Sequence, residues 1–247
     1  MKLLLIGIDC ATEDSKVGLA LAEYHGGDVT LRDATMCSRT RSVATTVAGW
    51  LRASESPALL AIDAPLGWPA SMGRALDNHR AGHRIRVPPN ELFRRTTDRF
   101  IHEHLGKTPL DVGADRIART AHSALSMLAE VSDLLRRPIP LAWSPEIAGV
   151  SAIEVYPAAT LVARGWRSTG YKKRAQVAER HEIVVTISAS VGIGEHGATL
   201  KAFPDALDAT VCVLAGKDFL EDACPCPADR SLAEREGWIW ASTRARL

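Results

Sequence analysis

The chain has 247 residues, of which 46% are hydrophobic, so it is long enough to bury a substantial core as one large domain or two small ones. A formal net charge of +1 excludes a protein coated in basic residues, and any contact with nucleic acid would therefore depend on a local basic patch. Five scattered cysteines, an odd number, argue against a disulfide framework.

The first predicted element is a short apolar run over residues 1–8 that stops at Asp9. It carries one lysine and is too short for a signal-peptide core or for a membrane span of roughly 20 residues. We interpret it as a buried strand of a cytosolic protein. The apolar spacing then predicts two strands joined by a turn, a helix and a further buried strand, over residues 17–24, 29–37, 43–51 and 59–62.

A change of composition begins near residue 65, where turns rich in proline and glycine surround two predicted helices over residues 90–105 and 115–135. We expect one domain over residues 1–247 that carries a helical insertion at about residues 68–149. Residues 74–107 hold eight Lys or Arg against four Asp or Glu and form the most basic stretch of the chain.

The C-terminal part predicts a strand over residues 151–156 and then mostly helices. These helical segments lie near Thr160, over residues 172–181 and over residues 205–219. The segment 236–240 is expected to form a strand or capping segment in which Trp238 and Trp240 pack against the sheet or its covering helices.

Acidic residues recur at corresponding places in these elements. Asp9 and Asp63 each end a short buried strand, and Glu154 lies within a third. We expect the strands of Asp9 and Asp63 to be parallel neighbours, because side chains at the carboxyl ends of such strands converge at one edge of a sheet. Asp205 and Asp208 are three residues apart on a helix, and either or both could complete a shared site. Carboxylates held close together repel one another, and a folded protein tolerates them best when a divalent cation, Mg²⁺ or Mn²⁺, is bound between them. The alternative is that each acid only caps a turn or a helix.

Five short strings of the sequence carry a family resemblance, at residues 7–11, 62–67, 154–157, 205–209 and 236–240. They resemble a bacterial and archaeal family of predicted RNase H-like nucleases of unknown function (DUF429), over nearly the whole chain. The resemblance implies an RNase H-like α/β fold, with a mixed sheet whose first hairpin is antiparallel and whose next strands are parallel. It also implies a metal site of Asp9, Asp63 and Asp208, with Glu154 and Asp205 as further catalytic candidates. The D-x-x-D spacing of the last helix is similar to that of Holliday-junction resolvases.

The chemistry that fits these residues is phosphodiester hydrolysis, in which carboxylates hold the cations that act on the attacking and leaving oxygens. Nucleic acid is then the expected partner, and no membrane is involved. A solvated basic surface remains the alternative for every basic candidate. The residues proposed to contact phosphates are Arg94, Arg95, Arg99, Lys172 and Lys173.

Two other functions remain possible for this sequence. A sugar-kinase or actin-like phosphotransferase also has an aspartate after its first strand, but it carries a glycine-rich phosphate loop that is missing after Asp9. A catalytically inactive RNase H-like binding or scaffold module is the non-enzymatic alternative, because a fold does not guarantee its function.

Overall fold

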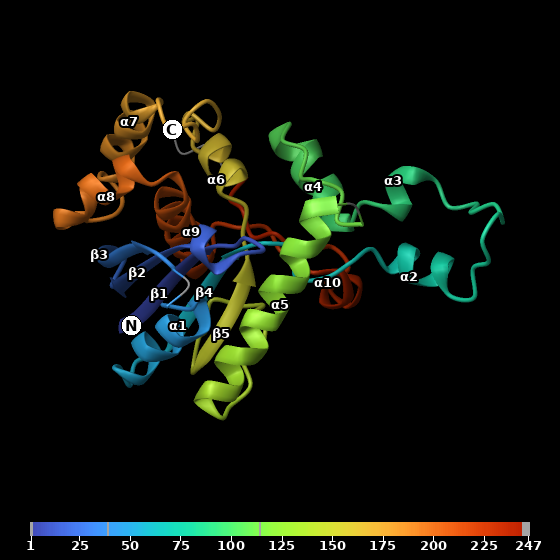
Figure 1. The fold of residues 1–247 in the computed structure, drawn as a ribbon, viewed down its shortest axis with the longest axis horizontal. Helices are drawn as coiled ribbons and strands as arrows, with labels where there is room; N and C mark the ends of the chain where they lie inside the picture. The colour runs from blue at the N-terminus through green and yellow to red at the C-terminus, as the bar shows by residue number, and fades with distance from the viewer. Residues whose placement is uncertain (1, 39, 114, 244–247) are drawn as a thin grey trace.

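A computed structural model describes residues 2–38, 40–113 and 115–243 of the chain. These residues form an α/β fold around one five-stranded sheet (Figure 1). The strand order is β3-β2-β1-β4-β5. The strands are β1 (Lys2–Asp9), β2 (Gly18–His25), β3 (Asp28–Met36), β4 (Ala58–Asp63) and β5 (Val150–Glu154).

The sheet is mixed, as the sequence predicts. β1 pairs antiparallel with β2, and β2 pairs antiparallel with β3 across the two-residue turn Gly26-Gly27, whereas β4 and β5 run parallel to β1. An antiparallel hairpin followed by parallel strands in this order is the arrangement of an RNase H-like fold. The observed strand ends differ from the predicted ones by one or two residues, except that the helix after Tyr156 ends the extended segment of β5 earlier, at Glu154.

Helices occupy most of the remaining chain and lie on both faces of the sheet (Figure 1). Two short 3-10 turns, η1 (Asp14–Lys16) and η2 (Gly194–His196), accompany them. The helices are α1 (Val43–Arg52), α2 (Ala70–Leu76), α3 (Pro89–Leu92), α4 (Thr96–Leu105), α5 (Asp115–Leu135), α6 (Pro157–Ala163), α7 (Val177–Ile187), α8 (Gly197–Ala202), α9 (Pro204–Leu220) and α10 (Arg230–Glu236).

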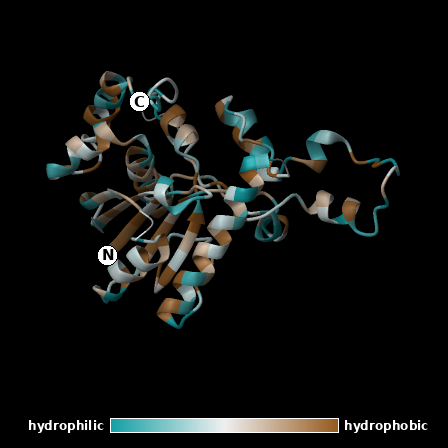
Figure 2. Cartoon of the chain, viewed as in Figure 1, coloured by the Kyte–Doolittle hydropathy of each residue, from teal (hydrophilic) through white to brown (hydrophobic). Residues whose placement is uncertain are grey.

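The alternation of side chains along the strands divides the core into two layers. Leu3 and Leu5 of β1 belong to the layer under α9, and Leu4 and Ile6 belong to the layer under α1 and α5. Because both faces are covered, the strands are apolar almost throughout, which Figure 2 shows as brown ribbons in the centre of the molecule.

The helical region at 68–149 has two structurally different parts. α5 covers one face of the sheet through residues such as Met127 and Val131, and so belongs to the main core. α2 and α3 with their connection instead extend away from the sheet (Figure 1). The predicted helix over 90–105 is interrupted between α3 and α4, and the one predicted over 172–181 begins only at Val177.

The end of the chain packs as expected. Trp238 is 4% exposed and Trp240 is 3% exposed, and the Trp240 ring lies 4.7 Å from that of Phe219 on α9. The main chain of Trp240 donates a hydrogen bond to the carbonyl of Glu154, which places this segment beside β5. In the described part of the chain, no helix is both long and apolar enough to cross a membrane.

Candidate metal and phosphate site

Asp9 and Asp63 lie side by side at the carboxyl edge of the sheet. They are direct partners in the parallel register of β1 and β4, so the predicted neighbourhood of these two strands is confirmed. Paired residues of neighbouring strands project to the same face, and here that face is the one covered by α9. Asp9 is only 8% exposed.

Two glycines bring helix α9 close enough to deliver a third acid. A Cβ on Gly7 would lie 1.9 Å from the carbonyl oxygen of Ala209, and one on Gly18 would lie 2.0 Å from that of Asp205. The helix backbone therefore touches the strands directly. Since Asp208 adjoins Ala209, this contact places Asp208 beneath Asp9, with no exposed surface.

Tyr171 and Lys172 contact the two oxygens of Asp208. The Tyr171 hydroxyl donates a hydrogen bond of 2.7 Å to Oδ1, and the Lys172 ammonium forms an ion pair of 2.5 Å with Oδ2. Tyr171 is buried, whereas the Lys172 side chain is 60% exposed. Tyr171 thus fixes the orientation of Asp208 from within the core, and Lys172 reaches the same carboxylate from solvent. Tyr171 was missed at the sequence level, where no spacing connects it with Asp208.

The acids influence one another electrostatically. Burial raises the pKa of Asp9 well above its ordinary value, and the charges of Asp208 and Asp63 raise it further. Burial and then the charge of Asp208 raise the pKa of Asp63 to about 7. Burial and Asp208 also raise the pKa of Asp205, in the first turn of α9. The four carboxyl groups therefore form one cluster in which negative charge is costly.

The donor chemistry of this cluster suits a hard cation, because carboxylate oxygens are the ligands that Mg²⁺ prefers. As the side chains stand, however, no group of three or more acidic, histidine or cysteine residues in the described chain is arranged to hold a metal ion. The positive charge that faces Asp208 is the ammonium of Lys172. A bound cation would therefore have to replace that ammonium and draw the carboxylates closer together.

Glu154 lines the same cavity as Asp9 and Asp63, and after burial and the charge of Asp208 its own charge also raises the pKa of Asp63, but it comes from the opposite face of the sheet. It is the register partner of Ile62 and shares a face of β5 with Ala152, on the side of the sheet that α1 and α5 cover. A strand reverses the side-chain direction at every residue, so Glu154 points away from the face of Asp9 and Asp63.

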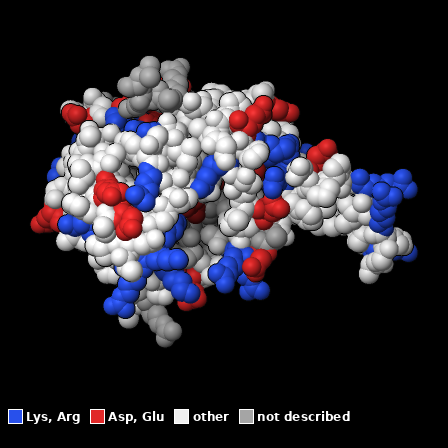
Figure 3. Space-filling view, turned by 90° about the horizontal axis from the view of Figure 1, so that it is seen from above, with Lys and Arg blue, Asp and Glu red and all other residues white. Residues whose placement is uncertain are grey.

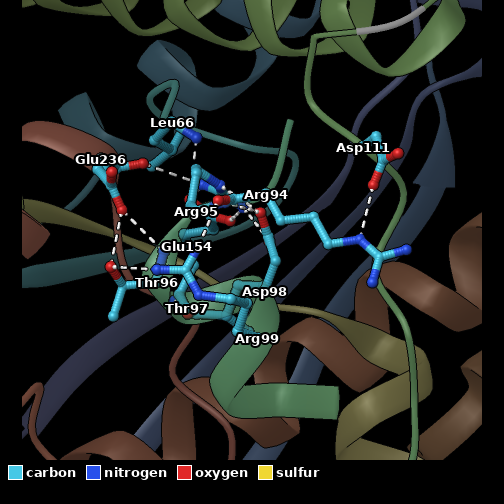
Figure 4. Close-up of polar contacts among 11 residues, drawn as sticks. Leu66, Arg94, Arg95, Thr96, Thr97, Asp98, Arg99, Asp111, Glu154 and Glu236 are labelled. Atoms are coloured by element: carbon cyan, nitrogen blue, oxygen red, sulfur yellow. Dashed lines mark hydrogen bonds and ion pairs between the residues drawn. The ribbon is translucent and has the colours of Figure 1, made fainter. Parts of the chain in front are cut away.

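Arg95 holds Glu154 in a buried network rather than contacting solvent (Figure 4). Arg95 is 1% exposed and donates hydrogen bonds of 2.7 and 2.8 Å to the two oxygens of Glu154. It also donates to both oxygens of Asp98, and the amide of Leu66 donates to Glu154 at 2.9 Å. The expectation that Arg95 contacts phosphate is therefore corrected, because its guanidinium is already occupied and buried.

Glu236 anchors the C-terminal segment to the same region. Its carboxylate accepts hydrogen bonds of 2.8 Å from the amides of Ala70 and Thr96 and one of 3.0 Å from the Thr96 hydroxyl. The expected strand or capping segment over 236–240 thus begins at the end of a helix: Glu236 is the last residue of α10, and Gly237 follows with φ at 85°.

The other basic candidates differ in whether their side chains are already paired within the protein. Arg94 pairs with Asp111 at 2.9 Å, and Arg99 donates to the carbonyl of Arg94 at 2.7 Å. Lys173 is exposed and forms no ion pair with a described residue. Of the expected phosphate contacts, Lys172 pairs with the acidic cluster from solvent, and the buried Arg95 lines the cavity beside it.

A cavity of about 290 Å³ opens beside Asp9 and Asp63. Its charged lining residues are Asp9, Asp63, Glu154, Arg95 and Lys172, and most of the others are apolar. In the space-filling view, acidic atoms are visible in the depth of a central hollow, with lysine and arginine side chains around it (Figure 3). The apolar and aromatic lining includes Pro65, Pro109, Leu110, Ile117 and Tyr156.

The sheet order and the acids at its carboxyl edge define a member of the RNase H-like α/β class. The family described as "Protein of unknown function (DUF429)" matches residues 7–231, and the chain belongs to that family. A comparison with curated proteins gave no match.

Proposed function

We propose that the protein is a divalent-metal-dependent nuclease that hydrolyses phosphodiester bonds at the cluster of Asp9, Asp63 and Asp208. One observation carries the proposal: two strands and a helix bring three carboxylates into a single buried cluster at the sheet edge, where burial and the charge of Asp208 raise the pKa of both Asp9 and Asp63 and so make their ionisation costly. A divalent cation, Mg²⁺ or Mn²⁺, removes that cost.

Each residue of the cluster has a role in this proposal. Asp9, Asp63 and Asp208 hold the cation, and Asp205 stands at the border of the cluster. When bound, the metal supplies charge stabilisation to the phosphoryl group and lowers the pKa of a coordinated water. Tyr171 keeps Asp208 oriented, and the exposed chain of Lys172, once released from Asp208, contacts a phosphate oxygen.

Nucleic acid is the proposed partner and the cytoplasm the proposed location. The location agrees with the cysteines, all five of which are free thiols, as expected where disulfides are kept reduced.

The activity is tested with a panel of single-stranded, duplex, hybrid and branched nucleic acids in the presence of Mn²⁺. We expect cleavage of at least one substrate, abolition of cleavage by EDTA and a loss of at least 100-fold in Asp63→Asn. Asp28→Asn is the matched control, because Asp28 is an exposed residue at the start of β3. A panel without metal-dependent cleavage, or full activity in Asp63→Asn, contradicts the proposal.

A binding or scaffold module is the second candidate, and the Lys172–Asp208 ion pair favours it, because this internal cation already neutralises part of the cluster. The two functions differ in their response to metal. A metal site raises the melting temperature on addition of Mn²⁺, and Asp9→Asn removes the rise. A scaffold neutralised by Lys172 shows no rise in either protein.

A further inference from the structure

The connection between α2 and α3 forms an arm, defined here as residues 77–88, that has no helix or strand of its own. It extends away from the rest of the molecule (Figure 1). Ten of its twelve residues are exposed, and the other two, Ile85 and Val87, are half-buried. Asn78 and Gly82 turn the backbone with φ of 59° and 82°. The arm therefore contributes little to the core, and packing does not require its exposed residues to be basic.

The arm carries positive charge that no acid of the fold neutralises. Arg80, Arg84 and Arg86 are exposed and form no ion pair with any residue in the described chain, and Asp77 is the only acid among the twelve. Figure 3 shows lysine and arginine atoms gathered toward the end of this extension. Three unpaired arginines in one short segment repel one another, and an external polyanion relieves that repulsion.

The arm and the acidic cluster are connected through the loop after β4. A groove of about 820 Å³ lies at the root of the arm, and its lining includes Arg74 and Arg235. The loop after β4 lines the groove at Leu66 and the acidic cavity at Pro65. The groove, which Asp77 also lines, and the acidic cavity are therefore adjacent, and a strand held by the arm lies near the cavity.

We propose that the arm binds the phosphate backbone of a nucleic-acid strand and holds it as the strand enters the site. The proposal depends on the proposed function for the identity of the strand, but the arm is tested by binding alone. A nucleic-acid strand is favoured over an acidic membrane, because the two apolar side chains of the arm are half-buried and offer no group to insert into lipid.

The test measures fluorescence anisotropy of labelled single-stranded and duplex oligonucleotides in EDTA over a series of salt concentrations. The variant Arg80→Gln/Arg84→Gln/Arg86→Gln is expected to lose at least 10-fold in affinity. Its slope of log affinity against log salt should fall in magnitude by about two to three, since each lost phosphate contact accounts for about 0.7–0.9. The corresponding Arg→Lys variant should retain most binding, because lysine also contacts phosphate as a point charge.

The matched control removes three exposed charges from the opposite edge of the sheet, in the variant Lys2→Gln/Arg136→Gln/Arg137→Gln. It should keep the affinity and salt slope of the unaltered protein. Equal effects of the two triple variants, or an unchanged slope in the arm variant, overturn the proposal. So do binding to anionic vesicles in place of oligonucleotides and a change of oligomeric state in the arm variant.

Binding and cleavage separate this proposal from the proposed function. If the arm variant loses binding while no substrate is cleaved under any condition, the arm proposal stands and the nuclease proposal fails. If cleavage is metal-dependent but the arm variant binds normally, the nuclease proposal stands and the arm proposal fails. Asp63→Asn is expected to lose cleavage and retain binding in EDTA.

Discussion

Asp9 and Asp63 are register partners, and neither carboxyl group can lose its proton without facing the charge of the other or of Asp208. The exposed Lys172 ammonium offsets part of this repulsion. A protein gains nothing in folding from such an arrangement, because burial of like charges destabilises the folded state. At the residue scale, this cost is the reason for the cation site that we propose.

The residue-scale prediction concerns the pH dependence of stability without metal. The pKa of Asp63 in the folded protein is about 7, above its ordinary value of 3.8, so the folded state binds this proton more tightly than the unfolded state. The contribution to stability is complete below about pH 4 and is lost as the pH rises toward 7. Urea denaturation at pH 5, 6, 7 and 8 in EDTA should show this decline.

Asp63→Asn should flatten the decline, because asparagine does not titrate, while the exposed control Asp28→Asn should leave it unchanged. Saturating Mn²⁺ should reverse the trend, because the cation competes with the proton for the carboxylates. An identical pH slope in Asp63→Asn and the unaltered protein would falsify the role given to Asp63.

At the scale of elements, the site depends on how closely α9 approaches β1. Gly7 permits direct contact between the strand and the helix backbone, and Asp208 reaches Asp9 only because of that contact. The hydrophobic residues on all sides of α9 show that the helix is buried throughout its middle and cannot shift without disturbing both strands and neighbouring helices.

We predict that Gly7→Ala lowers the free energy of unfolding by about 3 kcal/mol or more, because the added Cβ would lie 1.9 Å from the Ala209 carbonyl oxygen. Chemical denaturation measures the change. Gly49→Ala is the matched control: a Cβ at this exposed position of α1 meets no atom, and the change should stabilise by about 0.5–1 kcal/mol. Equal effects of the two substitutions would show that α9 does not pack on Gly7.

If Gly7→Ala fails to fold, Gly216→Ala provides the second measurement. Its Cβ would lie 2.9 Å from a terminal methyl carbon of Leu5, a side chain that can adjust. A smaller loss of stability, about 1–3 kcal/mol, is therefore expected. Mn²⁺ binding should be retained in this variant, because Gly216 lies two turns beyond Asp208 on α9.

At the scale of the whole molecule, Arg95 connects segments that are far apart in sequence. It joins the start of α4 to β5 through Glu154 and to the C-terminal segment through the carbonyl of Glu236 (Figure 4). The loop after β4 is held in the same network by the amide of Leu66. This loop follows Asp63 directly, so the network supports the acidic site from the opposite face of the sheet.

Arg95→Ala is predicted to destabilise the protein by about 3–5 kcal/mol, because it leaves Glu154 and Asp98 buried without their counter-charge. Arg95→Lys should rescue little, since an ammonium cannot pair with two carboxylates in bidentate geometry. Arg94→Ala is the control, at a half-exposed ion pair worth about 0–1 kcal/mol. Thermal and urea denaturation measure the three variants; a loss in Arg95→Ala no greater than in Arg94→Ala refutes the prediction.

The sequence by itself determined the strands, the first antiparallel hairpin and the position of Asp9 and Asp63 at strand ends, because apolar periodicity and turn signals are local features of the chain. The parallel strands were expected from the family resemblance, and the pairing of Asp9 with Asp63 from the convergence of strand ends. It also located both ends of α5 and of α9 to within one residue. Only the tertiary structure decided the rest. Glu154 is one residue out of step with the acidic face, Arg95 is charged yet buried, and Tyr171 meets Asp208 from another segment. Each depends on which segments pack together, and residue type alone does not encode which neighbours a side chain meets.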